Sequence, residues 1–473
     1  MLAKKIAFNT VISVAARVLS TAIALVSIGL LTRYLSRDAW GEYSIVITFG
    51  GVFAVLAEWG LYQLAIREIS KEGADQKKIV GNLFTMRLII SLFVFSAAPI
   101  IALSFPYSGR AQLGILVGMA GFWLLSGAQV LMGVFQKYLR MDKASLADVI
   151  GRLVQLGLVI LFIRLQFGFL WLVAAMSVSA LINFLLVFWF ARQYVHFSLS
   201  FDLSFWRRSF WQSFPLAVAN ILVMIYFSTD SLFLSVFKPA SDVGIYRLPY
   251  KMLESLIFFP AMFVGLVMPL LSGEAGRDRT RFKNIFQRSF DVLSVFALPL
   301  VAGTIVLSPA IINLLGGGRY GESVAVLNIL IVAVGVIFFS TLFSFSLIAM
   351  EKQKSLLWIS GAGALFNIAL NLIFIPRFSY YAAAVTTVLT EALVAVLMLA
   401  VIWRFLNFLP SFSRSTKNFL AALVMAAVLW RLQFLNLFLL LALGAIIYFG
   451  FLYLIKGISR QEIALLVKRD GSL

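Results

Sequence analysis

The stretch GFLWLVAAMSVSALINFLLVFWFA, residues 168–191, contains no charged side chain. A helix of about 20 mostly apolar residues crosses the ~30 Å hydrocarbon core of a bilayer, so this stretch predicts a membrane span. Similar stretches recur along nearly the whole chain, with only short polar loops between them. We therefore predict an all-α polytopic membrane protein with about 14 transmembrane helices. The predicted spans are 8–31, 44–65, 79–104, 111–136, 146–165, 168–191, 210–237, 245–270, 286–308, 322–346, 355–375, 380–403, 418–433 and 434–455.

Composition supports this class. Of the 473 residues, 62% are hydrophobic and 12% are charged, and the mean hydropathy is +0.99. A soluble domain carries about 25% charged residues. The chain has no cysteine, and His196 is its one histidine. These counts exclude disulfides, thiolate or histidine-rich metal sites and Ser-His-Asp triads. We expect no cofactor, no metal and no catalytic residue.

The distribution of positive charge predicts the orientation in the membrane. The formal net charge is +19. On a soluble chain this excess would suggest a nucleic-acid partner. On a membrane protein, Lys and Arg instead gather in cytoplasmic loops. Most of them fall on one predicted side, including the segments 66–78, 192–209 and 271–285. We therefore expect a bilayer partner and no nucleic acid, with both termini on the cytoplasmic side of the cell membrane and the first span retained.

The polar segment 192–209 divides the chain. Its Phe and Trp residues, with Arg207 and Arg208, are typical of a segment lying at the membrane surface. We predict an N-terminal lobe over 1–191, spans one to six, and a C-terminal lobe over 210–405, spans seven to twelve. Residues 406–473 then form an appended hairpin of spans thirteen and fourteen and a cytoplasmic tail.

A weak internal repeat supports the two lobes. Asp38, Gly41 and Tyr43 open the second span, and DVGIY, residues 242–246, opens the eighth. Both segments place an Asp, a Gly and a Tyr on a short external loop. Many transporters are built from such repeats and bind substrate where the repeats meet.

Several short segments resemble one family of membrane proteins. They are LTRYLSRDAWGEY (31–43), WGL (59–61) leading into REI (67–69), FKPASDVGIY (237–246) and LGGGRY (315–320), together with Asp230. They are similar to landmarks of the polysaccharide-biosynthesis, Wzx-type oligosaccharide-lipid flippases. Those proteins belong to the multidrug/oligosaccharidyl-lipid/polysaccharide exporter superfamily, and the resemblance covers roughly residues 1–400.

The resemblance implies a transporter and not an enzyme. It implies two six-helix lobes around a cavity that opens alternately to each side of the membrane. The implied substrate is a polyprenyl-phosphate- or diphosphate-linked oligosaccharide used for surface polysaccharide. A polysaccharide polymerase and glycosyltransferases are the implied partners.

Four cationic side chains lie within predicted spans: Arg17, Arg87, Arg152 and Lys251. A charge at mid-bilayer costs about 2.5–3.5 kcal/mol on insertion scales, so it usually faces a bundle interior or a transport path. The arginine fork matches phosphate oxygens. We expect all four to bind the substrate's phosphate. The alternatives are side chains that reach the headgroups, or structural pairs with Glu58, Asp148 or Glu254.

Four acidic residues are candidates for coupling to a proton or sodium ion: Glu58, Glu391, Glu254 and Asp230. Glu58 and Glu391 lie deeper in their spans than Asp230 and are favoured. Each is equally suited to be a counter-ion to the arginines.

Three other functions stay open on the sequence. A lipid II flippase shares the expected fold and cationic cavity. A multidrug or cation antiporter needs an acidic or aromatic cavity, which the embedded arginines disfavour. A membrane glycosyltransferase or polymerase needs acidic residues on a sizeable external loop, and the predicted external loops are about a dozen residues or shorter.

The absence of cysteine permits a direct topology test. Single cysteines introduced into 66–78, 192–209 or 271–285 should resist an impermeant maleimide added to intact cells and react after the membrane is opened. Labelling of a cysteine in 271–285 from outside would contradict the predicted orientation.

Overall fold

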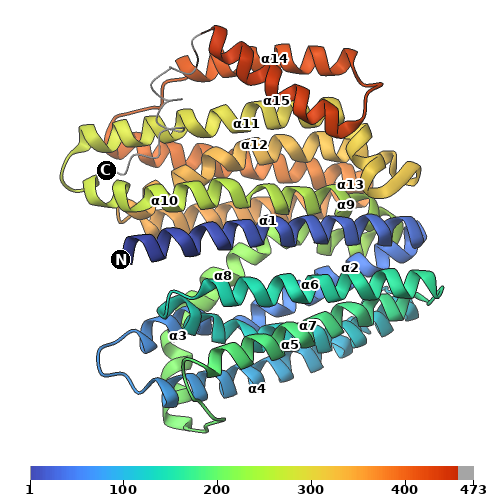
Figure 1. Ribbon diagram of the computed structural model, residues 1–473, viewed down its shortest axis with the longest axis vertical. Coiled ribbons are helices and arrows are strands. Elements are labelled where there is room, and N and C mark those ends of the chain that lie inside the picture. The colour runs from blue at the N-terminus through green and yellow to red at the C-terminus, as the bar shows by residue number, and fades with distance from the viewer. Residues whose placement is uncertain (1, 456, 458–473) are drawn as a thin grey trace. The chain divides into compact units, whose positions relative to one another are not determined.

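The computed structural model describes residues 2–455 and 457, and this part of the chain folds into helices without a strand (Figure 1). The predicted all-α class is confirmed. The helices are α1 Leu2–Tyr34, α2 Arg37–Glu58, α3 Leu61–Ile69, α4 Gln76–Ala102, α5 Gly109–Lys137, α6 Met141–Arg164, α7 Phe169–Arg192, α8 Leu203–Phe237, α9 Ala240–Leu256, α10 Phe258–Glu274, α11 Arg279–Gly316, α12 Glu322–Ala349, α13 Gln353–Leu406, α14 Ser413–Arg431 and α15 Leu437–Leu454, with a 3₁₀ turn at Gly317–Tyr320.

Among the described residues, 11 helices are long and apolar enough to cross a membrane, or up to 12 if α8, which bends by 54° after Leu222, counts as one span. The 54-residue α13 covers two predicted spans, because Ser379 breaks it with φ 51° and ψ −134°. In contrast, α14 carries Arg414, Lys417 and Arg431 within its 19 residues and does not meet that hydropathy criterion. The chain is therefore a multi-pass membrane protein, and the number fourteen stays a prediction.

The second span is broken where α2 ends. Trp59 and Gly60 both adopt left-handed backbone, with φ of 48° and 68°. A side chain on Gly60 would lie 2.8 Å from the Leu216 Cβ, so only glycine fits. The Trp59 ring stacks on Phe210 of α8 at 4.6 Å and offsets part of its own backbone strain. The break leaves the last carbonyls of α2 without helical partners.

Contacts divide the chain into two compact units. The first comprises Met1–Arg247, Leu315–Arg319 and Leu370–Tyr380. Within it α5 packs against α4 and α7, α6 packs against α7 and α1, and α2 packs against α4, α5 and α8. Small residues allow these helices to approach, because a side chain on Gly121 of α5 would lie 2.9 Å from the Ser177 Cα of α7.

The second unit comprises Leu248–Leu314, Tyr320–Ala369 and Tyr381–Leu473. Within its described part α10 packs on α12, and α14 packs antiparallel on α15 (Figure 1). Leu307 of α11 joins Met425, Leu429, Leu440 and Tyr448 of the α14–α15 hairpin in one buried apolar cluster. This cluster attaches the hairpin to α11.

The connector before α8 is held by polar contacts. Asn82 Oδ1 accepts hydrogen bonds from the Asp202 backbone N–H at 2.9 Å and from the Trp206 indole N–H at 3.1 Å. The Ser204 hydroxyl, the Phe205 N–H and Lys78 hold the pKa of the Asp202 carboxyl below its usual range. Asp202 therefore stays ionised well below neutral pH and caps α8 throughout that range.

The two segments of the weak repeat meet in the first unit. A side chain on Gly41 would lie 1.7 Å from the Ala240 carbonyl oxygen, and one on Gly244 would lie 2.9 Å from the Trp40 ring. The Trp40 indole N–H donates to the Gly244 carbonyl at 3.2 Å. The starts of α2 and α9 are thus in backbone contact, which requires glycine on both sides.

Gly41→Ala should destabilise the protein by about 1–3 kcal/mol, because the methyl group overlaps a backbone oxygen that has no rotamer to change. Thermal unfolding of the purified protein in detergent measures this as a lower Tm. Gly51→Ala is the matched control, since it lies on the same helix with open space around it. Equal melting temperatures for the two variants would contradict the contact.

Candidate functional site

Arg87 of α4 is fully buried and bound by protein groups. Its Nη1 donates to the Ala57 carbonyl at 2.5 Å, its Nε donates to the Ser126 carbonyl at 3.2 Å, and its Nη2 donates to the Gln129 Oε1 at 2.7 Å. Ala57 O is one of the carbonyls that the break after α2 leaves open. The guanidinium therefore ties the end of α2 to α4 and α5. In this conformation all three guanidinium nitrogens donate to protein groups, and the side chain holds three helices together.

Arg152 of α6 forms an ion pair with Asp148, one turn earlier, at 3.1 Å. The two side chains are 32% and 39% exposed. Both pair contacts use Nε, and the described part of the chain offers no hydrogen-bond partner to its two terminal nitrogens. Arg152 therefore forms the structural pair with Asp148 that the sequence offered as an alternative to phosphate binding. The two terminal nitrogens of its guanidinium stay available.

The face of α6 that carries Arg152 is not its most apolar face. Leu146, Leu153 and Ile160, spaced by seven residues, form the exposed apolar side of α6. Arg152 and Gln155 lie on a different side of the helix. Gln155 lies close to the buried Tyr43 hydroxyl of α2. Arg152 is therefore directed away from the surface that suits acyl chains.

Arg17 lies on α1, which packs against α6. Its side chain is exposed, at the edge of the side of α1 that buries Ser20 and Ser27. The Tyr34 hydroxyl at the end of α1 donates to the Phe167 carbonyl, just past the end of α6, at 2.9 Å. Counting back at ~1.5 Å per residue puts Arg17 and Arg152 about 26 Å and 18 Å from their helix ends. The two arginines thus lie on adjacent helices and differ by about 8 Å in depth.

Lys251 of α9 is paired within its own helix. Its Nζ lies 2.6 Å from the Glu254 Oε2, and the side chains are 37% and 33% exposed. This is the intrahelical pair that the sequence spacing also allowed. Glu254 therefore offsets the positive charge of Lys251 within the same helix.

The other acidic candidates differ in burial. Asp230 is buried and accepts hydrogen bonds from the Tyr246 hydroxyl and from the Ser231 backbone N–H. Glu391 is 4% exposed on α13, next to Thr390, whose hydroxyl lies 3.4 Å from the Asn367 amide nitrogen. Glu58 ends α2 close enough to Arg87 to act on it electrostatically. Among the described residues no three His, Cys, Asp or Glu side chains group as metal ligands.

Sequence reasoning missed the amide side chains that complete these sites. Gln129, Gln155 and Asn367 lie in apolar stretches and carry no charge, so hydropathy gives them little weight. A buried amide in a span still needs a partner, and that requirement is the signal that marks them.

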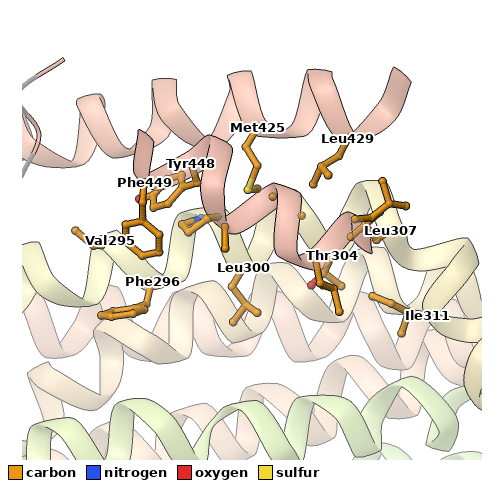
Figure 2. Close-up of a pocket in the computed structure, with 16 residues that line it drawn as sticks. Val295, Phe296, Leu300, Thr304, Leu307, Ile311, Met425, Leu429, Tyr448 and Phe449 are labelled. Atoms are coloured by element: carbon orange, nitrogen blue, oxygen red, sulfur yellow. The ribbon is translucent and has the colours of Figure 1, made fainter. Parts of the chain in front are cut away.

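An apolar cavity of about 320 Å³ lies between α11 and the α14–α15 hairpin (Figure 2). Phe296, Leu300 and Leu307 line it from α11, Met425 and Leu429 from α14, and Tyr448 and Phe449 from α15. Thr304 supplies one of its few polar groups. Gly303 and Gly444 also line it, and their lack of a side chain leaves room between the helices. The cavity suits a hydrocarbon chain.

Comparison with known families, related proteins and solved structures places this chain among known folds. The family described as "Polysaccharide biosynthesis protein" matches residues 6–273, and the family described as "MatE" matches residues 215–373. The Shigella flexneri "Putative O-antigen transporter" is 24% identical over 410 residues, which is 82% of this chain and 96% of that protein. The Haloferax volcanii "Probable flippase AglR" is 26% identical over 219 residues, but the match spans only 45% of its length.

A solved structure described as "Lipid II flippase MurJ, inward closed conformation" has the same fold. Its TM-score is 0.75 at 15% sequence identity, and the match covers 95% of this chain and 98% of that one.

Arg87 and Arg152 should respond differently to substitution. Arg87→Lys keeps the charge but loses the three-way contact, and each buried carbonyl left without a donor costs about 1–3 kcal/mol. We expect a low yield of monodisperse protein on size-exclusion chromatography for Arg87→Lys and a normal yield for Arg152→Lys. A normal yield and Tm for Arg87→Lys would show that its contacts are dispensable for folding.

Proposed function

Since this chain belongs to the polysaccharide biosynthesis protein family, we propose that it is a flippase for a polyprenyl-(di)phosphate-linked oligosaccharide used in surface polysaccharide. The observation that carries the proposal is the pair of accessible arginines on adjacent helices, Arg17 and Arg152. A lipid-linked sugar carries phosphate charge that must cross hydrocarbon. The relatives named as flippases and an O-antigen transporter support the same substrate class.

The arginines act on the phosphate by replacing lost water. A phosphate entering the membrane loses hydration, which is costly unless charged hydrogen-bond donors take its place. Arg152 is held at Nε by Asp148 and presents its Nη edge, the geometry that binds two phosphate oxygens. Arg17 supplies further positive charge from the adjacent helix α1. Arg87, engaged by Ala57, Ser126 and Gln129, positions the helices around them.

The lipid part of the substrate needs an apolar path. We propose that the cavity between α11 and the α14–α15 hairpin holds part of the polyprenyl chain, because its lining is apolar and its walls come from three helices (Figure 2). Burial of each CH₂ group there contributes about 0.8 kcal/mol relative to water. The sugar then travels with the phosphate, and the chain stays in an apolar environment.

Orientation, lobes and coupling complete the proposal. The protein lies in the cytoplasmic membrane with both termini inside and moves substrate from the cytoplasmic to the outer leaflet by alternating access. Its fourteen spans form lobes over 1–191 and 210–405, with the hairpin appended.

Asp230 and Glu391, both buried, are the favoured proton or sodium sites, and Glu58 and Glu254 act as counter-ions. Glycosyltransferases supply the substrate and a polymerase consumes it.

Removing the accessible arginines should abolish most transport. In a strain lacking the native transporter, Arg17→Ala/Arg152→Ala should reduce surface-polysaccharide display about tenfold or more, since each charged hydrogen bond contributes about 1.5–3 kcal/mol. Arg→Lys at both sites should retain part of the display. Arg404→Ala, at an exposed arginine at the end of α13, is the control for the loss of a positive charge elsewhere in the chain.

A second variant separates charge from pairing. The Asp148→Asn/Arg152→Gln variant removes the ion pair and leaves the net charge of the protein unchanged. Loss of display at normal protein level supports phosphate binding by Arg152. Full display by this variant and by the double alanine variant would show that the cations are structural, and the proposed mechanism would fail.

A further inference from the structure

A second cavity, of about 580 Å³, lies at the end of the first unit where α1 and α6 finish and α2, α5 and α7 begin. None of the embedded arginines lines it, and it shares no lining residue with the apolar cavity of the hairpin. Its polar lining includes Ser36, Arg110 and Gln166, and Tyr34, Phe167 and Phe169 supply aromatic walls. By the predicted orientation, this end faces the outer surface of the membrane.

Arg110 is fixed within the cavity by contacts on two sides. Its Nε donates to the Glu42 Oε2 at 2.5 Å, and the Glu42 side chain is 7% exposed. The other carboxylate oxygen, Oε1, accepts the Ser108 hydroxyl at 2.5 Å. The Arg110 Cζ lies 5.6 Å from the centre of the Phe169 ring. Both Glu42 oxygens are therefore occupied, and the guanidinium is held at its inner edge.

The outer edge of the same guanidinium is available. The Arg110 side chain is 49% exposed, and within the described residues its two terminal nitrogens have no hydrogen-bond partner. An arginine fixed at Nε and supported by a ring loses little side-chain entropy when it binds a ligand. Its remaining edge has the spacing of two phosphate oxygens.

The turn between α6 and α7 brings a further donor to the cavity. Gln166 is exposed and holds a left-handed backbone, with φ of 54°. This conformation is unfavourable for a residue with a side chain, and it directs the chain from α6 into α7 within a few residues. The Tyr34 hydroxyl donates to the neighbouring Phe167 carbonyl and fixes the turn. The Gln166 amide thus lines the cavity from a turn that is held in place.

The charge around the cavity favours an anion. Arg33 and Arg164 are exposed on the neighbouring helix ends, and α7 starts at Gly168 without a side-chain cap. The first turn of a helix adds partial positive charge. Asp38, exposed in the first turn of α2, is a nearby acid that opposes it, while the Glu42 charge is already offset by Arg110.

We propose that this cavity binds the phosphate of a lipid headgroup in the outer leaflet, with Arg110 as the principal ligand and Gln166 as a second donor. The ends of membrane helices lie at headgroup depth, which favours a lipid phosphate over a free one. The headgroup belongs either to the carried lipid after it has crossed or to an outer-leaflet phospholipid. The first source rests on the proposed function, and the second does not.

Binding to the full-length protein in detergent tests the site by native mass spectrometry. The probes are a short-chain polyprenyl diphosphate, phosphatidylglycerol and neutral diacylglycerol. Wild type should bind the phosphate lipids more strongly than diacylglycerol. Arg110→Gln should weaken binding about tenfold, the loss of a charged two-point contact. Arg431→Gln, an exposed arginine expected on the same membrane side, should leave binding unchanged.

A double variant and the comparison of the lipid probes separate loss of the site from misfolding and from failure of the proposed function. Glu42→Gln/Arg110→Gln avoids a buried unpaired carboxylate and should show the same weakening with a normal Tm. Arg110-dependent binding of polyprenyl diphosphate alone assigns the cavity to the released substrate, and binding of phosphatidylglycerol alone assigns it to bulk lipid. Wild-type affinity in a folded double variant would overturn the site. Failure of polyprenyl diphosphate to bind anywhere, with phosphatidylglycerol binding intact, would count against the proposed function instead.

Discussion

Every polar group inside a bilayer must be satisfied by the protein itself, and Arg87 shows how this constraint organises the first unit. The left-handed pair Trp59–Gly60 ends α2 early and leaves carbonyls open in a region without water. One guanidinium from α4 fills that need and also binds Ser126 and Gln129 of α5. The break, the cation and the amide form one feature, because none is stable there without the others.

The sequence predicted what depends on length and hydropathy. The all-α class, the multi-pass character and most span positions follow from ~20-residue apolar runs, which have few alternatives in a membrane. The break at Ser379 inside α13 and the polar character of α14 reflect local backbone and packing that hydropathy averages away. The spacing of Lys251 and Glu254 likewise allows the intrahelical pair that the structure contains.

The roles of the arginines were harder to predict for a physical reason. Insertion cost marks Arg17, Arg87 and Arg152 alike as unsuited to lipid, whether they face a path or a helix end. What separates them is which donors remain available. Arg87 is bound by Ala57 and Gln129, which are distant in sequence, whereas the partner of Arg152 within the described residues is Asp148, one turn earlier on the same helix. The resulting division gives one buried arginine that fixes the bundle and others on adjacent helices that can meet a phosphate. It matches the needs of a carrier for an amphipathic lipid, whose charged group and hydrocarbon chain require opposite environments.

The proposed function requires that this protein move a lipid-linked glycan between leaflets without changing it. Purified protein reconstituted into sealed vesicles with a fluorescent polyprenyl-diphosphate-linked oligosaccharide measures this directly, because a membrane-impermeant glycosidase cleaves only the glycans on the outer leaflet. We expect the wild-type protein to make the inner-leaflet pool accessible to the glycosidase, and we expect the lipid to keep its mass when the glycosidase is omitted. The Arg17→Ala/Arg152→Ala variant should expose the inner-leaflet pool much more slowly. An inner pool that stays protected with active wild-type protein, or a change in the mass of the lipid without glycosidase, would contradict the proposed function.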